Sequence, residues 1–257
     1  MKKVIWAIAT LIMTVVICSI KVSALADLES AMWDHYTEQF EIIMNYETFW
    51  SSGDEMDAYA HWYTITDLDH NGCLEIISAV NYSTGNLTHM EIYEVSTLTQ
   101  SMKPLRLWSP SFSMIGKEFD LLSGIIDTHY PDIAPWDSNT TSVPVFHHDN
   151  TGEWLYCCRN LNSVGSEENE EIVESISVYE GTLYIRPIVQ KYKVNPEGTV
   201  SYYNEMGKTI TESEYLNWEE RFSDFEKYDC KLSWFFLSDG LSFEMLEDSF
   251  STFMQSF

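Results

Sequence analysis

Residues 67–75, which read D-L-D-H-N-G-C-L-E, constrain the fold of this chain more than any other stretch. Asp67, Asp69 and Asn71 alternate along the chain, so their side-chain oxygens converge on one point in a tight loop, and Gly72 allows the sharp bend. The flanking segments A-H-W-Y-T-I-T and I-I-S-A-V are rich in aromatic and β-branched residues, which favour strands. The sequence therefore predicts an antiparallel hairpin that is closed by an acidic loop.

The acidic loop suits a calcium ion, which takes about six to eight hard oxygen ligands. Alternate loop positions supply carboxylate, amide and carbonyl oxygens, and the expected ligands are Asp67, Asp69, Asn71, the backbone carbonyl of Cys73, and Glu75. A helix-loop-helix EF-hand is disfavoured because its twelfth position is Ser78, inside a predicted strand. The alternative is a polar hairpin turn in which Asn71-Gly72 provides positive φ angles and the acids are solvated. Mutual repulsion of three carboxylates favours the metal site.

The N-terminus has the parts of a secretory signal peptide. Lys2-Lys3 precede an apolar run from Val4 to Ile20, and Ala24-Leu25-Ala26 provides the small residues of a cleavage site after Ala26. We therefore expect a signal peptide at residues 1–26 and a secreted, extracellular protein. An uncleaved membrane anchor is the alternative, because the apolar run is just long enough to span a bilayer.

The formal net charge of −26 argues against several partners. Removal of residues 1–26 takes away three lysines and no acids, which brings the charge to −29. Nucleic acids and anionic membrane surfaces bind basic faces, so we expect no nucleic acid partner and no membrane contact beyond the signal segment. An acidic surface also keeps an exported protein soluble.

Four cysteines follow the signal segment, and an even number in an exported chain permits disulfides in any of three pairings. They are Cys73, Cys157, Cys158 and Cys230. Cys157 and Cys158 are adjacent in a predicted strand, so their side chains should point to opposite faces. The sequence leaves open whether one disulfide forms or all four are buried thiols.

Helices are expected near both ends of the chain, at residues 27–50, 211–228 and 243–257, from apolar residues at helical spacing. Thr211 and Glu214 form a capping box. Between the helices expected at 27–50 and 211–228 lie two predicted β regions. The first is a three-stranded meander around the acidic loop, and the second is a series of hairpins from residue 153 to 203. We expect a connection at 103–110, a short helix at 117–130 with a buried strand as the alternative, and an acidic loop at 166–171. The predicted fold class is α+β: antiparallel meanders and hairpins flanked by these helices in one exported domain, 27–257, with a candidate internal boundary at 131–152.

The chain resembles exported proteins of Gram-positive anaerobes whose role is unknown. The resemblance rests on W-Y-T-I-T-D-L-D-H-N-G-C-L-E-I-I, H-M-E-I-Y-E-V, T-G-E-W-L-Y, Y-E-G-T-L-Y and G-K-T-I-T-E-S-E-Y, in this order. The acidic loop also resembles the D-x-D-x-D-G-x-x-D loops of integrin-type propeller blades. The resemblance implies export and calcium binding but no reaction. His70 and Asn71 stand where the pattern often has Gly and Asp, and one carboxylate fewer weakens the site, to a dissociation constant of about 10⁻⁴ to 10⁻³ M.

Common catalytic motifs are absent from the sequence: there is no H-E-x-x-H, G-x-S-x-G, P-loop or Rossmann glycine run. His147-His148-Asp149 could contribute zinc ligands, but adjacent histidines in a loop lack the usual spacing and are more often simply exposed. The main prediction is a secreted calcium-binding protein in which the ion is structural, and whether it is an enzyme stays open. The first alternative is a glycan-binding module, in which exposed aromatic rings beside acids would stack on sugars. The second, less favoured, is a hydrolase without a common motif. A cell-surface glycan or protein is the expected partner.

Overall fold

The structure, a computed structural model, describes residues 33–51, 58–82, 87–108, 125–129, 139–164, 168–194, 198–237 and 240–257. The expected signal peptide at residues 1–26 lies outside the described residues. Of the candidate boundary at 131–152, residues 140–148 form a strand, and residues 131–138 also lie outside the described part of the chain.

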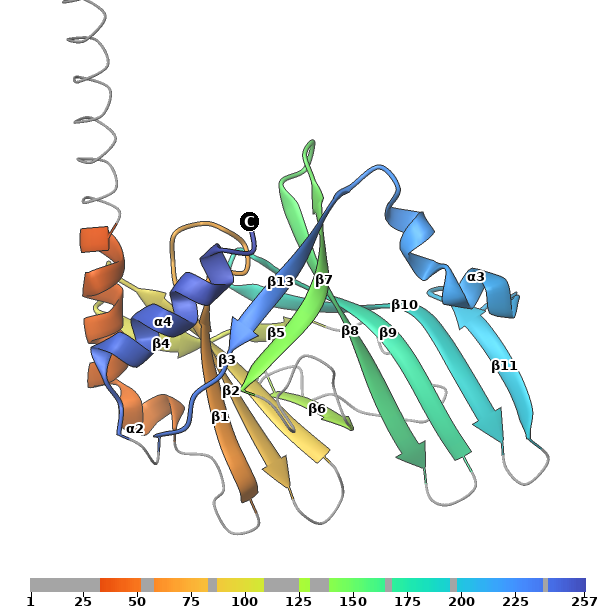
Figure 1. Ribbon diagram of the computed structural model, residues 1–257, viewed down its shortest axis with the longest axis horizontal. Helices are drawn as coiled ribbons and strands as arrows, with labels where there is room; N and C mark the ends of the chain where they lie inside the picture. The colour runs from red at the N-terminus through yellow and green to blue at the C-terminus, as the bar shows by residue number, and fades with distance from the viewer. Residues whose placement is uncertain are drawn as a thin grey trace, which may run out of the picture.

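The first sheet contains the predicted meander around the acidic loop (Figure 1). Its strands pair in the order β1 (Ala58–Thr66), β2 (Glu75–Tyr82), β3 (Leu87–Ser96) and β4 (Ser101–Pro104), and β6 (Ile125–His129) also pairs with β3. All of these pairs are antiparallel. Thr66 is paired with Glu75, so the register of β1 and β2 closes the hairpin directly around the loop.

The second sheet has eight strands and contains most of the second predicted β region. Its order is β12 (Thr209–Ile210), β11 (Thr199–Asn204), β10 (Thr182–Val194), β9 (Glu168–Tyr179), β8 (Glu153–Val164), β7 (Thr140–His148) and β13 (Glu226–Ser233). A short strand, β5 (Arg106–Trp108), runs parallel to β10. The described residues thus form mainly antiparallel sheets with a few helices, as expected.

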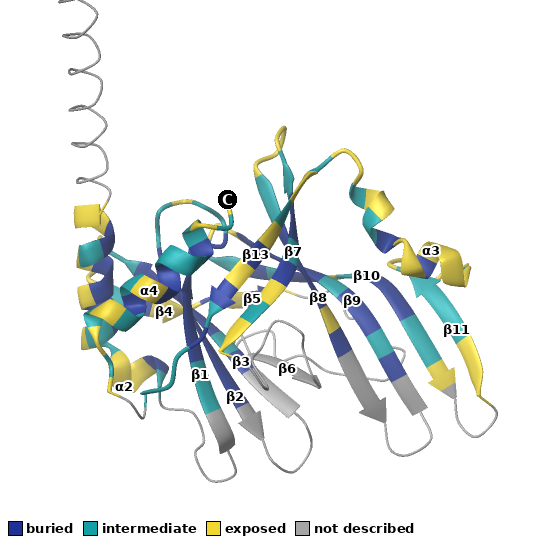
Figure 2. Cartoon of the chain, in the orientation of Figure 1, coloured by how far each residue is buried: buried dark blue, intermediate teal, exposed yellow. Residues whose placement is uncertain are grey.

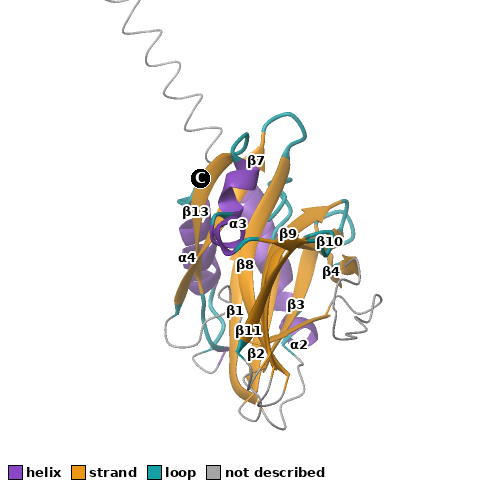
Figure 3. Ribbon diagram, turned by 90° about the vertical axis from the view of Figure 1, so that its right-hand side faces the viewer, coloured by secondary structure: helices purple, strands orange, loops and turns teal. Residues whose placement is uncertain are grey.

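Helices occupy the two ends of the described chain. A helix at residues 33–45 is followed by α2 (Glu47–Trp50), and α4 (Phe243–Met254) lies near the C-terminus. Helix α4 packs on β1 and β13, one strand from each sheet, and it lies on the opposite side of the molecule from β4 (Figure 3). Leu246, Phe250 and Phe253 of its predicted apolar face are buried, but the helix ends at Met254, before the predicted residue 257, and Phe257, the fourth residue of the predicted face, is exposed.

The two sheets meet beneath α4, where buried residues gather (Figure 2). Tyr63 of β1 and Phe235, which follows β13, exchange two backbone hydrogen bonds of 3.0 and 2.9 Å. The buried hydroxyl of Ser249 on α4 accepts from the Ile65 amide at 3.0 Å and donates to the Ser233 carbonyl at 2.8 Å. One helical side chain therefore connects a strand of each sheet.

Three predicted segments are different in the structure. The described part of the expected helix at 117–130 is strand β6, as in the alternative, because β3 leaves a free edge beside β4 with which residues 125–129 pair. The expected connection at 103–110 includes the end of β4 and all of β5, which pairs with the distant β10. The expected acidic loop at 166–171 is, from Glu168 onward, the start of β9. There the buried Glu170 accepts a hydrogen bond from Gln190, and Glu171 forms ion pairs with Lys191 and Arg159.

The expected helix at 211–228 is shorter than predicted. Its capping box is confirmed: Thr211 accepts from the Glu214 amide at 3.2 Å, and Glu214 accepts from the Thr211 amide at 2.8 Å. The helix α3 (Glu212–Leu216) is followed by a 3₁₀ turn at Trp218–Phe222, and the chain then enters β13. Residues 226–228, which local periodicity assigned to the helix, instead belong to β13, because they pair with β7.

The four described cysteines form no disulfide in the structure. Cys157 and Cys158 are both buried, but they belong to two separate hydrophobic clusters on the two faces of β8. The prediction that their side chains point to opposite faces is therefore confirmed. Of the two expectations left open, buried thiols agree with the structure at Cys157, Cys158 and Cys230, whereas Cys73 in the acidic loop is partly exposed.

Candidate metal centre

The acidic loop lies at the corner between β1 and β2, with its acids facing inward. Asp67 follows directly after β1 and is 3 % exposed, and Glu75, the first residue of β2, is 0 % exposed. Between them Asp69 is partly buried. Carboxylate oxygens of these three residues lie within 4.8 Å of one another, which is close enough for a single ion to contact all three.

The backbone of the loop wraps around Asp67. Its two carboxylate oxygens accept hydrogen bonds from the amides of Asn71 and Gly72, at 2.9 and 3.0 Å. The bend requires positive φ at two residues, Gly72 (84°) and His70 (53°). The glycine was expected, but the second residue is His70 and not Asn71. Asn71 instead uses its side chain, which accepts from the Cys73 amide at 2.6 Å and donates to Asp69 at 2.9 Å.

Two buried carboxylate oxygens in the loop have no hydrogen-bond partner. One oxygen of Glu75 accepts from the Leu68 amide at 2.8 Å and from the Thr66 hydroxyl at 3.2 Å, but its other oxygen is orphaned. One oxygen of Asp69 is orphaned in the same way. A buried acceptor without a partner costs about 1–3 kcal/mol, and more if it is charged. The loop is therefore built around oxygens that the protein itself does not satisfy.

The loop carboxyls hold protons more tightly than solvated acids. Burial raises the pKa of Asp67 to about 7, and the charge of Asp69 acts in the same direction, against the amides of Gly72 and Asn71. Burial and the nearby Asp67 raise the pKa of Glu75 well above its ordinary value. Burial and Glu94 raise the pKa of Asp69. Without a cation the loop therefore stores unfavourable charge, which either protons or a metal can neutralise.

The N-terminal helix at residues 33–45 holds the loop from one side. Gln39 is 0 % exposed, and its amide nitrogen donates to the Gly72 carbonyl at 2.7 Å while its oxygen accepts from the Leu74 amide at 2.7 Å. The His35 ring also contacts the Gly72 carbonyl, at 3.0 Å. Gln39 was not predicted as a site residue. The sequence feature that could have identified Gln39 is its position beside Phe40, where it is a polar residue on the apolar face of the expected helix.

The second sheet holds the loop from the other side through His70. The His70 ring stacks on Trp154 of β8, with centroids 3.9 Å apart and planes at 25°, and also contacts Phe257. The buried Tyr156 hydroxyl lies 3.3 Å from His70 Nε2. Burial lowers the pKa of His70 to about 4, so this ring is neutral at physiological pH. His70 thus fixes the middle of the loop by packing and adds no charge to it.

A further acid, Glu94, lies beside the loop acids on the neighbouring strand. It is paired with Glu75 in the register of β2 and β3 and is 7 % exposed. Lys103 of β4 forms an ion pair with Glu94 at 2.9 Å. The positive charge of Lys103 therefore partly offsets the charge of Glu94, which still raises the pKa of Asp69.

A cleft of about 740 Å³ opens beside the loop. Asp69 and Asn71 form one wall, and the other walls come from the turn at 151–153, residues 177–180, Tyr184 and Arg186. Arg186 forms an ion pair with Glu153 at 2.7 Å, and its guanidinium lies 5.3 Å from the centre of the Tyr184 ring. The cleft thus combines an acidic wall with an aromatic ring and a paired cation.

Of the five predicted ligands, the structure brings together the carboxylates of Asp67, Asp69 and Glu75. Asn71 borders the same cleft as Asp69, with its oxygen turned to the Cys73 amide. Ser78, whose position argued against an EF-hand, lies within β2 as expected.

No family model matches the chain, and no curated protein or solved structure matches it either. Among the described residues no helix is long and apolar enough to span a membrane. The candidate function therefore rests on the geometry of the site itself.

The role of Gln39 can be tested with Gln39→Leu, which keeps the size of the side chain but leaves the buried Leu74 amide without this acceptor. We expect the free energy of unfolding to fall by about 1–3 kcal/mol, measured from urea denaturation curves. The matched control is Glu41→Gln, an exposed residue of the same helix, which should change stability little. Equal effects of the two substitutions would contradict the assigned role.

The raised carboxyl pKa values predict how stability depends on pH when calcium is absent. Between about pH 4 and pH 7 folded Asp67, with a pKa of about 7, retains a proton that the unfolded chain, with an ordinary value of 3.8, has released. The folded state then binds more protons, so the free energy of unfolding falls as the pH rises through this range. Asp67→Asn should flatten this dependence. Asp34→Asn, which makes the same charge change on the exposed side of the helix at 33–45, should leave it unchanged.

Proposed function

We propose that the loop at residues 67–75 binds one calcium ion and that the ion is structural. The observation that carries the proposal is Glu75, a fully buried carboxylate with one oxygen unpartnered beside two further carboxylates. Buried charges in proteins are paired or coordinate metals. A cation among these three residues would give the orphaned oxygens of Glu75 and Asp69 a partner and would cancel the repulsion of the acids.

Calcium fits this loop better than other common ions. The expected donors, Asp67, Asp69, Asn71, the Cys73 carbonyl and Glu75, are all oxygens, which calcium prefers, whereas zinc takes nitrogen and sulfur ligands as well. Magnesium requires a nearly ideal octahedron and keeps several waters. An irregular loop with acids of unequal burial supports the ion that tolerates irregular coordination.

The proposed role of calcium is to fix a junction. The loop contacts the N-terminal helix through Gln39 and the second sheet through His70. An ion that holds the loop in one shape therefore stabilises both contacts. We also propose that the protein is exported and cleaved after Ala26. This agrees with a weak calcium site, because extracellular fluids contain enough calcium to fill it.

Calcium should stabilise the folded chain, because it binds only the assembled loop. At a calcium concentration ten times the dissociation constant, the gain is about 1.4 kcal/mol, which raises the melting temperature by about 3–6 °C. Thermal unfolding with calcium and with chelator measures this gain, and calorimetry measures the uptake directly. No heat of binding at millimolar calcium and no thermal shift would rule out the site.

The substitution Glu75→Gln provides the sharpest form of this test. It removes the buried charge but keeps an oxygen for the Leu68 amide, and its amide nitrogen can donate to a neighbouring carboxylate. We therefore expect the variant to be at least as stable as the wild type in chelator and to lose the calcium response. Asp34→Asn is the control and should keep the response. A Glu75→Gln variant that still responds to calcium would contradict the assignment.

A second candidate function is glycan binding in the cleft beside the loop. It is favoured by the Tyr184 ring and the paired Arg186 and Glu153 in the cleft, with Trp108 packed 5.4 Å from Tyr184. Aromatic faces beside polar groups suit sugar rings. A row of exposed tryptophans does not occur among the described residues: Trp33 and Trp108 are exposed on separate elements, and Trp50, Trp218 and Trp234 are buried.

The glycan candidate predicts that soluble oligosaccharides from bacterial or host surfaces bind the chain and that Tyr184→Ala weakens the binding at least about tenfold, which corresponds to 1.4 kcal/mol. Tyr203→Ala, on β11, is the control and should have no effect. Titration calorimetry with and without calcium measures both. Oligosaccharide binding that is equal in all three proteins would place the glycan outside this cleft.

A further inference from the structure

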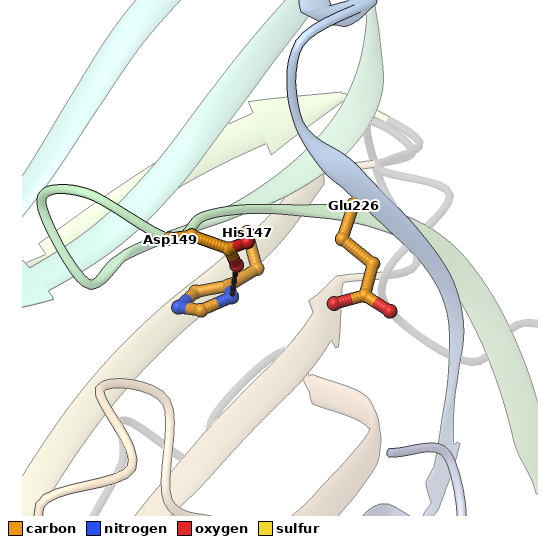
Figure 4. Close-up of side chains that lie close together, drawn as sticks. All are labelled: His147, Asp149 and Glu226. Carbon is orange, nitrogen blue, oxygen red and sulfur yellow. Dashed lines mark ion pairs between the residues drawn. The ribbon is translucent and has the colours of Figure 1, made fainter.

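A second group of metal-ligating side chains lies at the C-terminal end of β7, next to Trp154, on which both His147 of this group and His70 of the acidic loop stack. His147 of β7, Asp149 in the following turn and Glu226 at the start of β13 point toward one another (Figure 4). One potential ligand atom from each lies within 4.8 Å of the others. His147 Nδ1 is 3.3 Å from a carboxylate oxygen of Asp149.

The backbone brings these three residues together by register. Strands β7 and β13 are antiparallel, and Glu226 is the direct partner of His147, so the two side chains project from the same face. His148 projects from the opposite face, where it contacts Thr151 at 2.9 Å and packs on Phe225. The adjacent histidines therefore have different surroundings, and only His147 faces the two acids.

The His147 ring is held in place before any ion binds. It stacks on Trp154, its partner on β8, with centroids 4.0 Å apart and planes at 21°. Its side chain is only 19 % exposed. This stack fixes the ring plane and directs Nδ1 toward the acids, which distinguishes the group from a patch of solvated carboxylates. A preorganised imidazole is what a metal site requires from its nitrogen ligand.

Tyr228 lies two residues after Glu226 on β13, so the two side chains project from the same face of the strand. The Tyr228 ring packs on Trp154, with centroids 5.5 Å apart. Lys227, between them in sequence, points to the other face, where it pairs with Glu219 and lies over Phe146. The nearest lysine along the strand therefore does not neutralise the two acids of this group.

We propose that His147, Asp149 and Glu226 form a second metal site, which binds zinc or a similar divalent transition metal. One imidazole nitrogen and two carboxylates are a mixed donor set that suits zinc better than calcium. Three protein ligands leave a fourth position of the tetrahedron for water or an external donor. The three ligands of this site lie outside the acidic loop, and the two sites share Trp154 as a neighbour.

The experiment is a calorimetric titration of the full chain, without a histidine tag, with zinc chloride. It is repeated with the Glu75→Gln variant, so that zinc uptake by the acidic loop is measured separately. We expect one zinc ion per chain. His147→Gln and Glu226→Gln should each weaken binding by more than about tenfold, and the matched control His148→Gln should bind as the wild type does. Glu226→Gln removes an exposed ligand without touching the core, so it remains informative if His147→Gln loosens the stack on Trp154.

A second measurement locates the bound ion. Copper and nickel ions quench the fluorescence of a nearby indole, and Trp154 is in contact with His147. Titration with nickel should quench part of the tryptophan emission, and this quenching should be lost in His147→Gln and in Glu226→Gln but retained in His148→Gln. Absence of zinc binding by the wild type, or equal zinc affinity in His147→Gln, Glu226→Gln and His148→Gln, would overturn the proposal.

Discussion

Buried negative charge at the corner of the first hairpin is the constraint on which the rest of the structure depends. Glu75 has no exposure to solvent, and Asp67 has almost none. Water cannot screen these acids, so the surrounding chain must supply donors or a counter-ion. Backbone amides of the loop supply donors to Asp67 and to one oxygen of Glu75. The remaining orphaned oxygens are where a cation would complete the arrangement.

The same corner is also where distant parts of the chain meet. The helix at 33–45 contacts the loop backbone through Gln39. Its side chain is hydrogen-bonded to Gly72 and Leu74, which follow it in the sequence by 33 and 35 positions. The second sheet reaches the loop through Trp154 and Tyr156. A loop that only closed a hairpin would need neither contact. The position of the acids at this junction is the reason for proposing a structural role for a bound ion.

The sequence was sufficient where the signal was local. Alternating acids with a glycine predicted the loop, the Thr211 and Glu214 pair predicted a helix start, and the strand period predicted that Cys157 and Cys158 face different clusters. The sequence was insufficient where pairing between distant segments decided the structure. Periodicity assigned residues 125–129 and 226–228 to helices. In the structure they are strands, because they pair with the free edges of β3 and β7. The contacts of Gln39 and His70 with the site likewise join residues far apart in sequence, which no local pattern encodes.

The backbone bridge between Tyr63 and Phe235 has a consequence for the kinetics of folding. The two residues belong to opposite ends of the described chain, yet they form the only isolated bridge found among its described residues. Closing so long a segment costs chain entropy before any hydrogen bond repays it, and domains rich in such contacts fold slowly. We therefore expect the apolar strands on either side of the bridge to be accessible to proteases and prone to aggregation until the bridge closes. Conditions that hasten closure would raise the yield of folded protein even where they leave its final stability unchanged.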